Sequence, residues 1–286
     1  MRIVGFSLVA NAVRLDFPIL EALGSILPLC DELIVNVGPS DDGTLDLVRG
    51  LDDPRLRVVE GRWDQGQGSA LLAVETQRAL NLALGDWAIY IQADEILHED
   101  GVGPLQAALE RAEQDQRVEA LLVDFVHFYG TPEWTGASRA WYRREVRAIR
   151  LGREIHSRGD AQGFRAGPHQ RRVRARSSGA TYFHYGWARP LDVLRCKQQI
   201  DDRLYHDGAG KRASLGERLP HDVGLTRFTG QHPARMEPWI AARLARMTPG
   251  FAPRRWDVRR LSLLATLAVE RLTGWRPFEY KNYVEV

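Results

Sequence analysis

The sequence predicts an α/β protein with a Rossmann-like, mainly parallel sheet that carries helices on both faces. Short apolar runs typical of buried strands alternate with segments that have the apolar spacing of helices. One such run, residues 87–91, passes into Asp94 and Glu95 without a glycine or a proline in between. Because ligands bind at the carboxyl ends of strands in open parallel sheets, this junction is the first candidate site.

Three strands are expected in the first 60 residues, at residues 3–9, 33–37 and 56–59. Between them, a proline-marked segment at residues 17–29 and the stretch LDLVRGL after the turn GPSDDGT have helical spacing. This order of strand and helix is typical of βαβ units, so it indicates parallel strands.

The next helix follows a loop at residues 66–69 and ends at Gly85, before the strand WAIYI. A helix at residues 102–113 and the strands EALLVDFVHF, EVRAIRL and ATYFHYG come next. After Pro190 the pattern is mostly helical, with an irregular stretch at residues 208–233 and an amphipathic helix near residues 257–272. We therefore expect one domain at residues 1–200 and a mostly helical C-terminal extension at residues 201–286.

Composition is that of an ordinary globular protein and excludes several classes. The 286 residues carry a formal net charge of +2, and no nucleic-acid-binding motif is present, so we expect no nucleic-acid partner. No apolar run approaches the roughly 20 residues of a membrane-spanning helix. Cys30 and Cys196 lack metal or redox spacing, and no signal peptide precedes the first strand. We expect a cytoplasmic protein, either free or at the inner face of the membrane.

The acids Asp94 and Glu95 have two interpretations. Carboxylates at a strand end can form a solvated helix cap. Alternatively, they are hard ligands for Mg²⁺ or Mn²⁺, which usually bind through one or two carboxylates and the phosphates of a substrate. A departing diphosphate gathers negative charge that such an ion stabilises. The pair therefore suggests a nucleotide-diphosphate site.

Four segments follow one another along the chain in this order: SLVANAV, DELIVNVGPSDDGT, ETQRALNLALGDWAIYIQADE and YFHYGW. Together, over roughly residues 1–200, they resemble the family 2 glycosyltransferases of the GT-A type. The resemblance implies an inverting, metal-dependent enzyme with Mn²⁺ or Mg²⁺ as cofactor. It would move a sugar from a nucleotide-diphosphate sugar to a hydroxyl of a glycan or lipid-linked acceptor, in cell-envelope or surface polysaccharide synthesis.

The resemblance also implies roles for individual residues. Asp94 matches the metal-binding acid that ends the Asp-x-Asp motif of the family. The loop after the first strand lies against the nucleotide, the turn after the second strand lies beside base and ribose, and one helix flanks the base. The implied nucleotide-sugar set is Ala10, Asn11, Gly38, Ser40, Asp42, Gln77, Gln92, Ala93 and Asp94.

Departures from the family pattern leave the donor base open. Gln92 replaces the first acid of Asp-x-Asp, so an amide hydrogen bond replaces a ribose or metal contact and metal affinity should fall. Ala12 stands where many members carry Glu, and VGPS at residues 37–40 replaces Asp-Asp-Gly-Ser.

His184 follows the strand ATYF. A lone histidine is usually a packed or surface residue, but the resemblance implies that it completes the metal site, and neutral imidazole can bind Mn²⁺. Tyr185 and Trp187 would then be walls of the site. Three other histidines are weaker candidates, namely His127, His156 and His169.

An inverting enzyme needs a carboxylate that takes the proton of the acceptor hydroxyl. The Glu-Asp pair that the family often uses is missing here, and IHSRGDAQGF offers Asp160 as catalytic base. Flanking glycines would let this loop reach a substrate. Alternatively, Asp160 caps a turn or pairs with Arg158. Glu154 is then the fallback base, and Asp124 is less favoured because it lies within an apolar strand.

Arginines crowd into residues 139–176 in two sets. We expect the first to line one side of the site near the diphosphate or an anionic acceptor, and both to favour a phosphorylated or lipid-linked acceptor. Aromatic residues between them could stack on sugar rings or belong to the core. The sets are Arg143, Arg147 and Arg150, then Arg171, Arg172, Arg174 and Arg176, and the aromatics are Trp134, Trp141 and Tyr142.

Some alternatives stay open. The C-terminal amphipathic helix either packs on the first domain or lies on anionic lipid, which would make peripheral membrane contact. A sugar-nucleotide nucleotidyltransferase shares the sheet, but it needs a glycine-rich loop that SLVANAVRLDF lacks. A non-catalytic nucleotide-binding homologue is the third reading, because Gln92 and the missing Glu-Asp pair both weaken the catalytic pattern.

Overall fold

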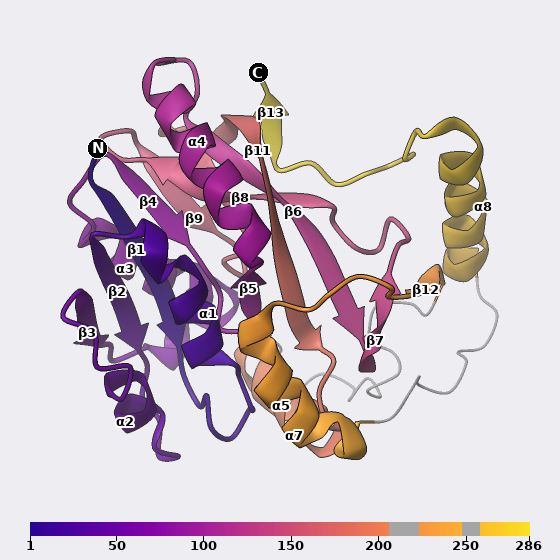
Figure 1. Ribbon diagram of the computed structural model, residues 1–286, viewed down its shortest axis with the longest axis horizontal. Helices are drawn as coiled ribbons and strands as arrows, with labels where there is room; N and C mark the ends of the chain where they lie inside the picture. The colour runs from indigo at the N-terminus through magenta and orange to yellow at the C-terminus, as the bar shows by residue number, and fades with distance from the viewer. Residues whose placement is uncertain (206–222, 248–257) are drawn as a thin grey trace.

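The computed structural model describes residues 1–205, 223–247 and 258–286 (Figure 1). In this part of the chain, thirteen strands form one sheet whose main path runs β3-β2-β1-β4-β8-β6-β11-β10-β9. Helices lie against both faces of the sheet, so the structure confirms the predicted α/β class.

The first half of the chain alternates strands with helices, as the sequence predicts. Its strands all run parallel and are β1 (Ile3–Val9), β2 (Glu32–Val37), β3 (Leu56–Glu60) and β4 (Trp87–Tyr90). The helices and short 3₁₀ turns between them are α1 (Ile19–Ile26), η1 (Leu27–Leu29), α2 (Thr44–Arg49), η2 (Gln65–Ala70) and α3 (Leu71–Asn81).

The second half of the sheet is mixed rather than parallel. Strand β8 (Arg144–Arg150) lies between β4 and β6 (Ala120–Tyr129) and runs antiparallel to both. Strand β11 (Arg171–Trp187) runs parallel to β6 and also pairs with β5 (Glu95–Leu97) in antiparallel orientation. The sequence does not predict β5, because three residues are too short for a periodic signal.

The remaining elements complete the sheet and its C-terminal surroundings. They are η3 (Glu99–Gly101), α4 (Val102–Glu113), β7 (Thr131–Gly136), β9 (Ile155–Arg158), β10 (Gly163–Ala166), α5 (Leu191–Tyr205), β12 (Leu225–Arg227), η4 (Ala234–Met236), α7 (Glu237–Arg243), η5 (Leu244–Arg246), α8 (Val258–Thr273) and β13 (Tyr283–Glu285).

Two apolar layers hold the helices to the sheet. On one face, α1 and α4 pack against the sheet through Leu23 and Leu109, and on the other face α3 packs through Leu80. Strand β1 is buried along its whole length because both of its faces are covered. Its Gly5 is needed for this packing, since an added Cβ would lie only 2.8 Å from the Cys30 Sγ.

The C-terminal segment returns to the sheet. Helix α5 runs across residue 200, and β13 pairs with β11 beside the start of that strand (Figure 1). The proposed division at residue 200 therefore stays a prediction. Most of the predicted irregular stretch, residues 208–222, lies outside the described residues. Among the described helices, none has the length and the apolar character to cross a bilayer.

Candidate active site

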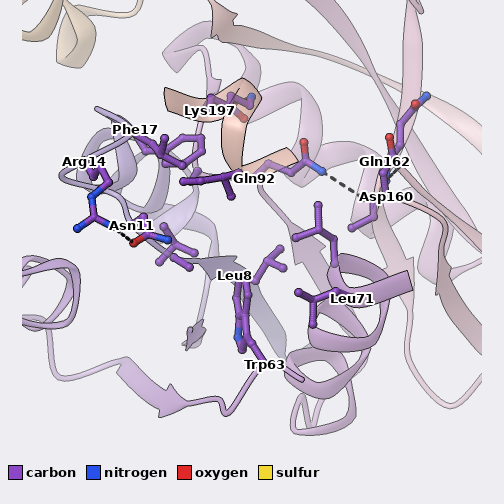
Figure 2. Close-up of a pocket in the computed structure, with 18 of the residues that line it drawn as sticks. Leu8, Asn11, Arg14, Phe17, Trp63, Leu71, Gln92, Asp160, Gln162 and Lys197 are labelled. Atoms are coloured by element: carbon purple, nitrogen blue, oxygen red, sulfur yellow. Dashed lines mark hydrogen bonds and ion pairs between the residues drawn. The ribbon is translucent and has the colours of Figure 1, made fainter. Parts of the chain in front are cut away.

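A pocket of about 850 Å³ opens at the carboxyl ends of β1 and β4, the edge of the sheet that the sequence predicts. One side is formed by the loop after β1 and by α5, and the opposite side by the turn between β9 and β10 (Figure 2). The three positions 92–94 of the motif after β4 line it, together with His184 from the end of β11. The pocket therefore brings together segments that are about ninety residues apart in the chain.

Asp94 is almost fully buried at the base of this pocket and is surrounded by positive groups. Its Oδ2 accepts a hydrogen bond from Arg189 Nη2 at 2.7 Å and lies 3.6 Å from Lys197 Nζ. Its Oδ1 lies 3.7 Å from His184 Nε2. Gly186 makes this approach possible, because an added Cβ would lie 2.4 Å from the His184 ring. The predicted solvated cap is wrong for Asp94.

Electrostatics keep Asp94 ionised. Burial alone would raise the pKa of this carboxyl, but the positive charges of Lys197 and Arg189 outweigh burial and hold the pKa well below its usual range. The carboxylate is thus available as a ligand or an ion-pair partner at any physiological pH.

A chain of hydrogen bonds sets the tautomer of His184. His127 Nε2 lies 2.8 Å from the Tyr142 carbonyl oxygen, which can only accept, so this nitrogen carries a proton. In a neutral ring, His127 Nδ1 then accepts from His184 Nδ1, 2.9 Å away. Burial lowers the pKa of both rings, so both are neutral near pH 7. His184 Nε2 is therefore left with a lone pair that faces Asp94 Oδ1.

These two atoms fit a divalent ion, with the donor set that Mn²⁺ or Mg²⁺ accepts. The Asp94 carboxylate and the His184 Nε2 atom carry no proton, and they are close enough for one ion to contact both. In the described part of the chain, no group of three or more histidine, cysteine or acidic side chains could hold a metal. The phosphates of a substrate would have to supply further ligands.

Glu95, in contrast, faces away from the pocket. Its two oxygens accept from Arg147 Nη2 and Nε at 2.6 and 2.9 Å, and both side chains are fully buried. Asp94 lies in a turn that is closed by a hydrogen bond from the Glu95 N–H to the Gln92 carbonyl oxygen at 3.1 Å, whereas Glu95 is the first residue of β5, so the neighbouring acids have different surroundings. The solvated cap is wrong here too, and Glu95 cannot reach the metal position.

The same buried arginine fixes the turn between β9 and β10. Arg147 Nη1 donates to the carbonyl oxygen of Gln162, whose side chain donates to Glu145 at 2.8 Å. From the pocket side, the Gln92 amide donates to the Ala161 carbonyl oxygen at 3.1 Å. Gln92 therefore ties the end of β4 to this turn, a role that the sequence did not predict for it.

Asp160 lies in this turn and lines the pocket. It is exposed, and its Oδ1 accepts from the backbone N–H of Gln162 at 3.3 Å, so it also caps its own turn. Among the described side chains, no ion pair joins Asp160 to Arg158. The fallback candidates lie elsewhere: Glu154 is exposed beside His156, outside the pocket lining, and Asp124 pairs with Arg144.

The other predicted nucleotide residues separate into two groups. Ala10 and Asn11 line the pocket. Ser40 and Asp42 lie behind them, since Ser40 Oγ accepts from the Asn11 N–H and Asp42 accepts from the Arg14 N–H. Gly38 and Gln77 are also absent from the pocket lining. Gly38 packs against Trp63, which lines the pocket. The Gln77 Oε1 atom accepts a hydrogen bond from the Ser157 N–H.

The expected arginine lining is wrong. Arg147 lies buried beneath the pocket, as described above. Arg150 binds Glu113 at 3.0 Å and the carbonyl groups at the end of α4, and Arg143 binds Glu279 at 2.6 Å. Each of these charges is already compensated, so this set does not mark an anion site.

The second arginine set lies at the start of β11, whereas the pocket lies near its end. Arg171 and Arg174 bind Glu119, and Arg176 binds Asp115 at 2.9 Å. These arginines therefore do not indicate an anionic acceptor.

Some of the aromatic candidates line the pocket, and others are buried elsewhere. Tyr142 and Trp187 line the pocket, while Trp141 belongs to the core. Tyr185 is buried and lies 2.8 Å from His232 through its hydroxyl group, so it is not a wall of the pocket.

Several pocket residues were not predicted. Lys197 is one of them, and it follows the motif YFHYGW by ten positions. Arg189 binds Asp94 without lining the pocket, and because it follows the same motif by two positions, a basic residue so close to a predicted metal ligand was a usable signal. Arg14, Phe17, Trp63 and Gln162 are further lining residues for which the sequence carries no evident signal.

The family model described as Glycosyl transferase family 2 matches residues 18–170, which is just over half of the chain. Among solved structures, S. aureus TarS is 15% identical over 70% of this chain and 39% of that chain, with a TM-score of 0.44. Residues 1–349 of TarS in complex with UDP are 20% identical over 45% of this chain and 36% of that chain, with a TM-score of 0.33. The matches thus span less than two thirds of these TarS chains. No curated protein matches this chain.

Proposed function

Because the chain belongs to glycosyl transferase family 2, and is therefore a glycosyltransferase, we propose that it is an inverting, metal-dependent enzyme that uses a nucleotide-diphosphate sugar. The single observation that supports this most is the facing pair of Asp94 Oδ1 and His184 Nε2, 3.7 Å apart, at the base of a pocket that also contains Asp160. The acceptor in this proposal is a hydroxyl group of a glycan or of a lipid-linked glycan.

The diphosphate of the donor would lie at the Asp94 end of the pocket. Asp94 and His184 would hold Mn²⁺ or Mg²⁺, which when bound neutralises charge on the departing nucleoside diphosphate. The cations around Asp94 belong to the protein itself and act on the same phosphates. Family members generally use such an ion, and the donor set described above supports its use here.

The nucleoside would occupy the less polar end of the pocket. Leu8, Trp63 and Leu71 line that end, and an aromatic ring among aliphatic side chains suits a flat base (Figure 2). Arg14 lies beside Asn11 and donates to its Oδ1 at 3.2 Å. Neither contact selects one base, so the proposal leaves the base open.

Asp160 would act as the base. A hydroxyl group of the acceptor attacks the anomeric carbon from the side opposite the leaving diphosphate, and the Asp160 carboxylate takes the hydroxyl proton. Asp160 lines the pocket on the side opposite Asn11 and Arg14, which supports this assignment (Figure 2). The Arg147 and Gln92 contacts to the neighbouring backbone would hold it at a fixed distance from the donor.

The exposed surface formed by α8 and the segment after it supports contact with a lipid surface. The helix packs inward through Leu263 and Leu267. Its other side and the segment after it expose large apolar and aromatic groups, and Arg271 lies among them, a composition typical of helices at membrane interfaces. The exposed groups are Val258, Leu261, Leu264, Leu272, Trp275, Phe278 and Tyr280. The cytoplasmic location and the role in envelope polysaccharide synthesis remain predictions.

Calorimetry with a panel of nucleoside diphosphates tests the proposed function. We expect at least one to bind, more tightly with Mn²⁺ than with a chelator, and Asp94→Asn to abolish this difference. Asp100→Asn is the matched control, because Asp100 is an exposed acid outside the pocket lining. No binding of any nucleotide under either condition would reject the proposal.

A further inference from the structure

Helix α5 places a lysine at the diphosphate end of the pocket. Lys197 lies three and four residues after Leu194 and Val193, which are both buried, so it shares the inward face of the helix. Ile200, three residues later, also lines the pocket. The ammonium group of Lys197 therefore points into the site and not into solvent (Figure 2).

Aromatic rings hold the ammonium group in this position. Lys197 Nζ lies 5.7 Å from the centre of the Phe17 ring and 5.4 Å from that of the Trp187 ring. Cation–π contacts of this kind stabilise a partly desolvated charge. The side chain is only 21% exposed, so the charge is poorly screened by water.

Lys197 is the more weakly held of the two cations beside Asp94. Arg189 forms the closer ion pair with this carboxylate, at 2.7 Å. Lys197 lies 3.6 Å from it, and among the described residues no other acid lies within ion-pair distance of Lys197. A poorly screened cation beside a pocket attracts an anion.

We propose that Lys197 is a donor-binding residue that contacts the diphosphate directly. In this proposal, which rests on the proposed function, Lys197 moves its ammonium group from Asp94 to a phosphate oxygen when the donor binds. The contact gives the protein a hold on the diphosphate that does not depend on a metal ion. Until the donor binds, the same charge opposes the entry of a divalent ion beside Asp94.

Pyrophosphate and Mn²⁺, each added separately, are the probes that test this proposal. With a chelator present, we expect Lys197→Met to weaken pyrophosphate binding about tenfold or more by calorimetry, the usual value of a charge-assisted hydrogen bond. Mn²⁺ alone, followed by electron paramagnetic resonance, should bind the variant several-fold more tightly than the wild type. Lys281→Met is the matched control, because Lys281 is an exposed lysine outside the pocket lining.

Further variants keep the result interpretable. Lys197→Arg should retain most of the pyrophosphate affinity, because it keeps the positive charge. If Lys197→Met melts at a lower temperature than the wild type, Lys197→Gln is measured in its place. Unchanged pyrophosphate affinity in a folded Lys197 variant would overturn the proposal. That outcome differs from failure of the proposed function, in which no nucleoside diphosphate binds the wild type even with Mn²⁺.

Discussion

Glu95 and Arg147 form a fully buried, two-point ion pair directly beneath the pocket that the neighbouring Asp94 faces. The pair links β5 to β8, and the same guanidinium reaches the backbone of Gln162 in the turn that carries Asp160. Two adjacent acids thus have separate tasks. Asp94 faces the pocket, and Glu95 holds together the elements that surround it.

Removal of Glu95 should be costly for stability. Glu95→Ala leaves the Arg147 charge buried without its partner, and we expect the free energy of unfolding to fall by about 3–5 kcal/mol in urea titrations. Glu60→Ala breaks an exposed pair with Arg49 and should cost less than about 1 kcal/mol. Equal losses in the two variants would contradict the scaffold role.

Asp160 should be needed for transfer and not for donor binding. If it takes the proton of the acceptor, Asp160→Asn should keep its affinity for the nucleoside diphosphate and lower the transfer rate by about 10²–10⁴-fold. Both are measurable, by calorimetry and by product formation with the preferred donor. Glu154→Gln serves as control, and a slow Glu154 variant beside a fully active Asp160 variant would move the base to Glu154.

Acid stability should depend on Glu119. Burial would raise the pKa of this carboxyl, but its contacts with Arg171 and Arg174 lower it from 4.5 to about 2. Between about pH 4.5 and 2, the Glu119 carboxyl is protonated in the unfolded chain and ionised in the folded protein. The stabilisation from its contacts with the arginines is therefore complete above about pH 4.5 and is lost as the pH falls toward 2.

The difference in unfolding free energy between wild type and Glu119→Gln should accordingly shrink as the pH is lowered through this window. Urea titrations at a series of pH values measure it. Glu60→Gln, which alters an exposed pair with Arg49, is the control and should show only a small difference. A Glu119 difference that stays constant from pH 6 to acid would rule out the predicted linkage.

Lipid contact should require the exposed aromatic groups after α8. Trp275 is 66% exposed, and we expect Trp275→Ser combined with Leu272→Ser to reduce sedimentation with vesicles that contain anionic lipid. Point variants are preferable to truncation, because β13 pairs with β11. Leu84→Ser, which alters an exposed leucine after α3, is the control. Equal soluble fractions for all proteins would exclude this surface as the lipid contact.

Much of the fold could be predicted from sequence because its signals are local. The predicted strand at residues 3–9 and helix at residues 102–113 agree with β1 and α4 to the residue. The first is a continuous apolar run that is too short for a typical helix, and the second has the apolar spacing of a helix. The antiparallel insertion of β8 between β4 and β6 could not be predicted, since strand order depends on contacts between distant segments.

The candidate site divides in the same way. Asp94 and His184 were predicted by their motifs, and the fold brings them within 3.7 Å of each other. The prediction that Arg147 lines the pocket was wrong. Its partner Glu95 lies 52 positions earlier in the chain, so no local pattern in the sequence reveals the ion pair. Lys197 was not predicted at all, since only the packing of α5 turns it toward Asp94.

By itself, the sequence determined the α/β class, the motifs of the family and the acid in the turn after β4, because each depends on neighbouring residues. Tertiary structure alone decided which charges face the pocket. Every arginine and acid carries its charge wherever it lies, and only the folded arrangement shows which charges neutralise one another and which remain available for a ligand.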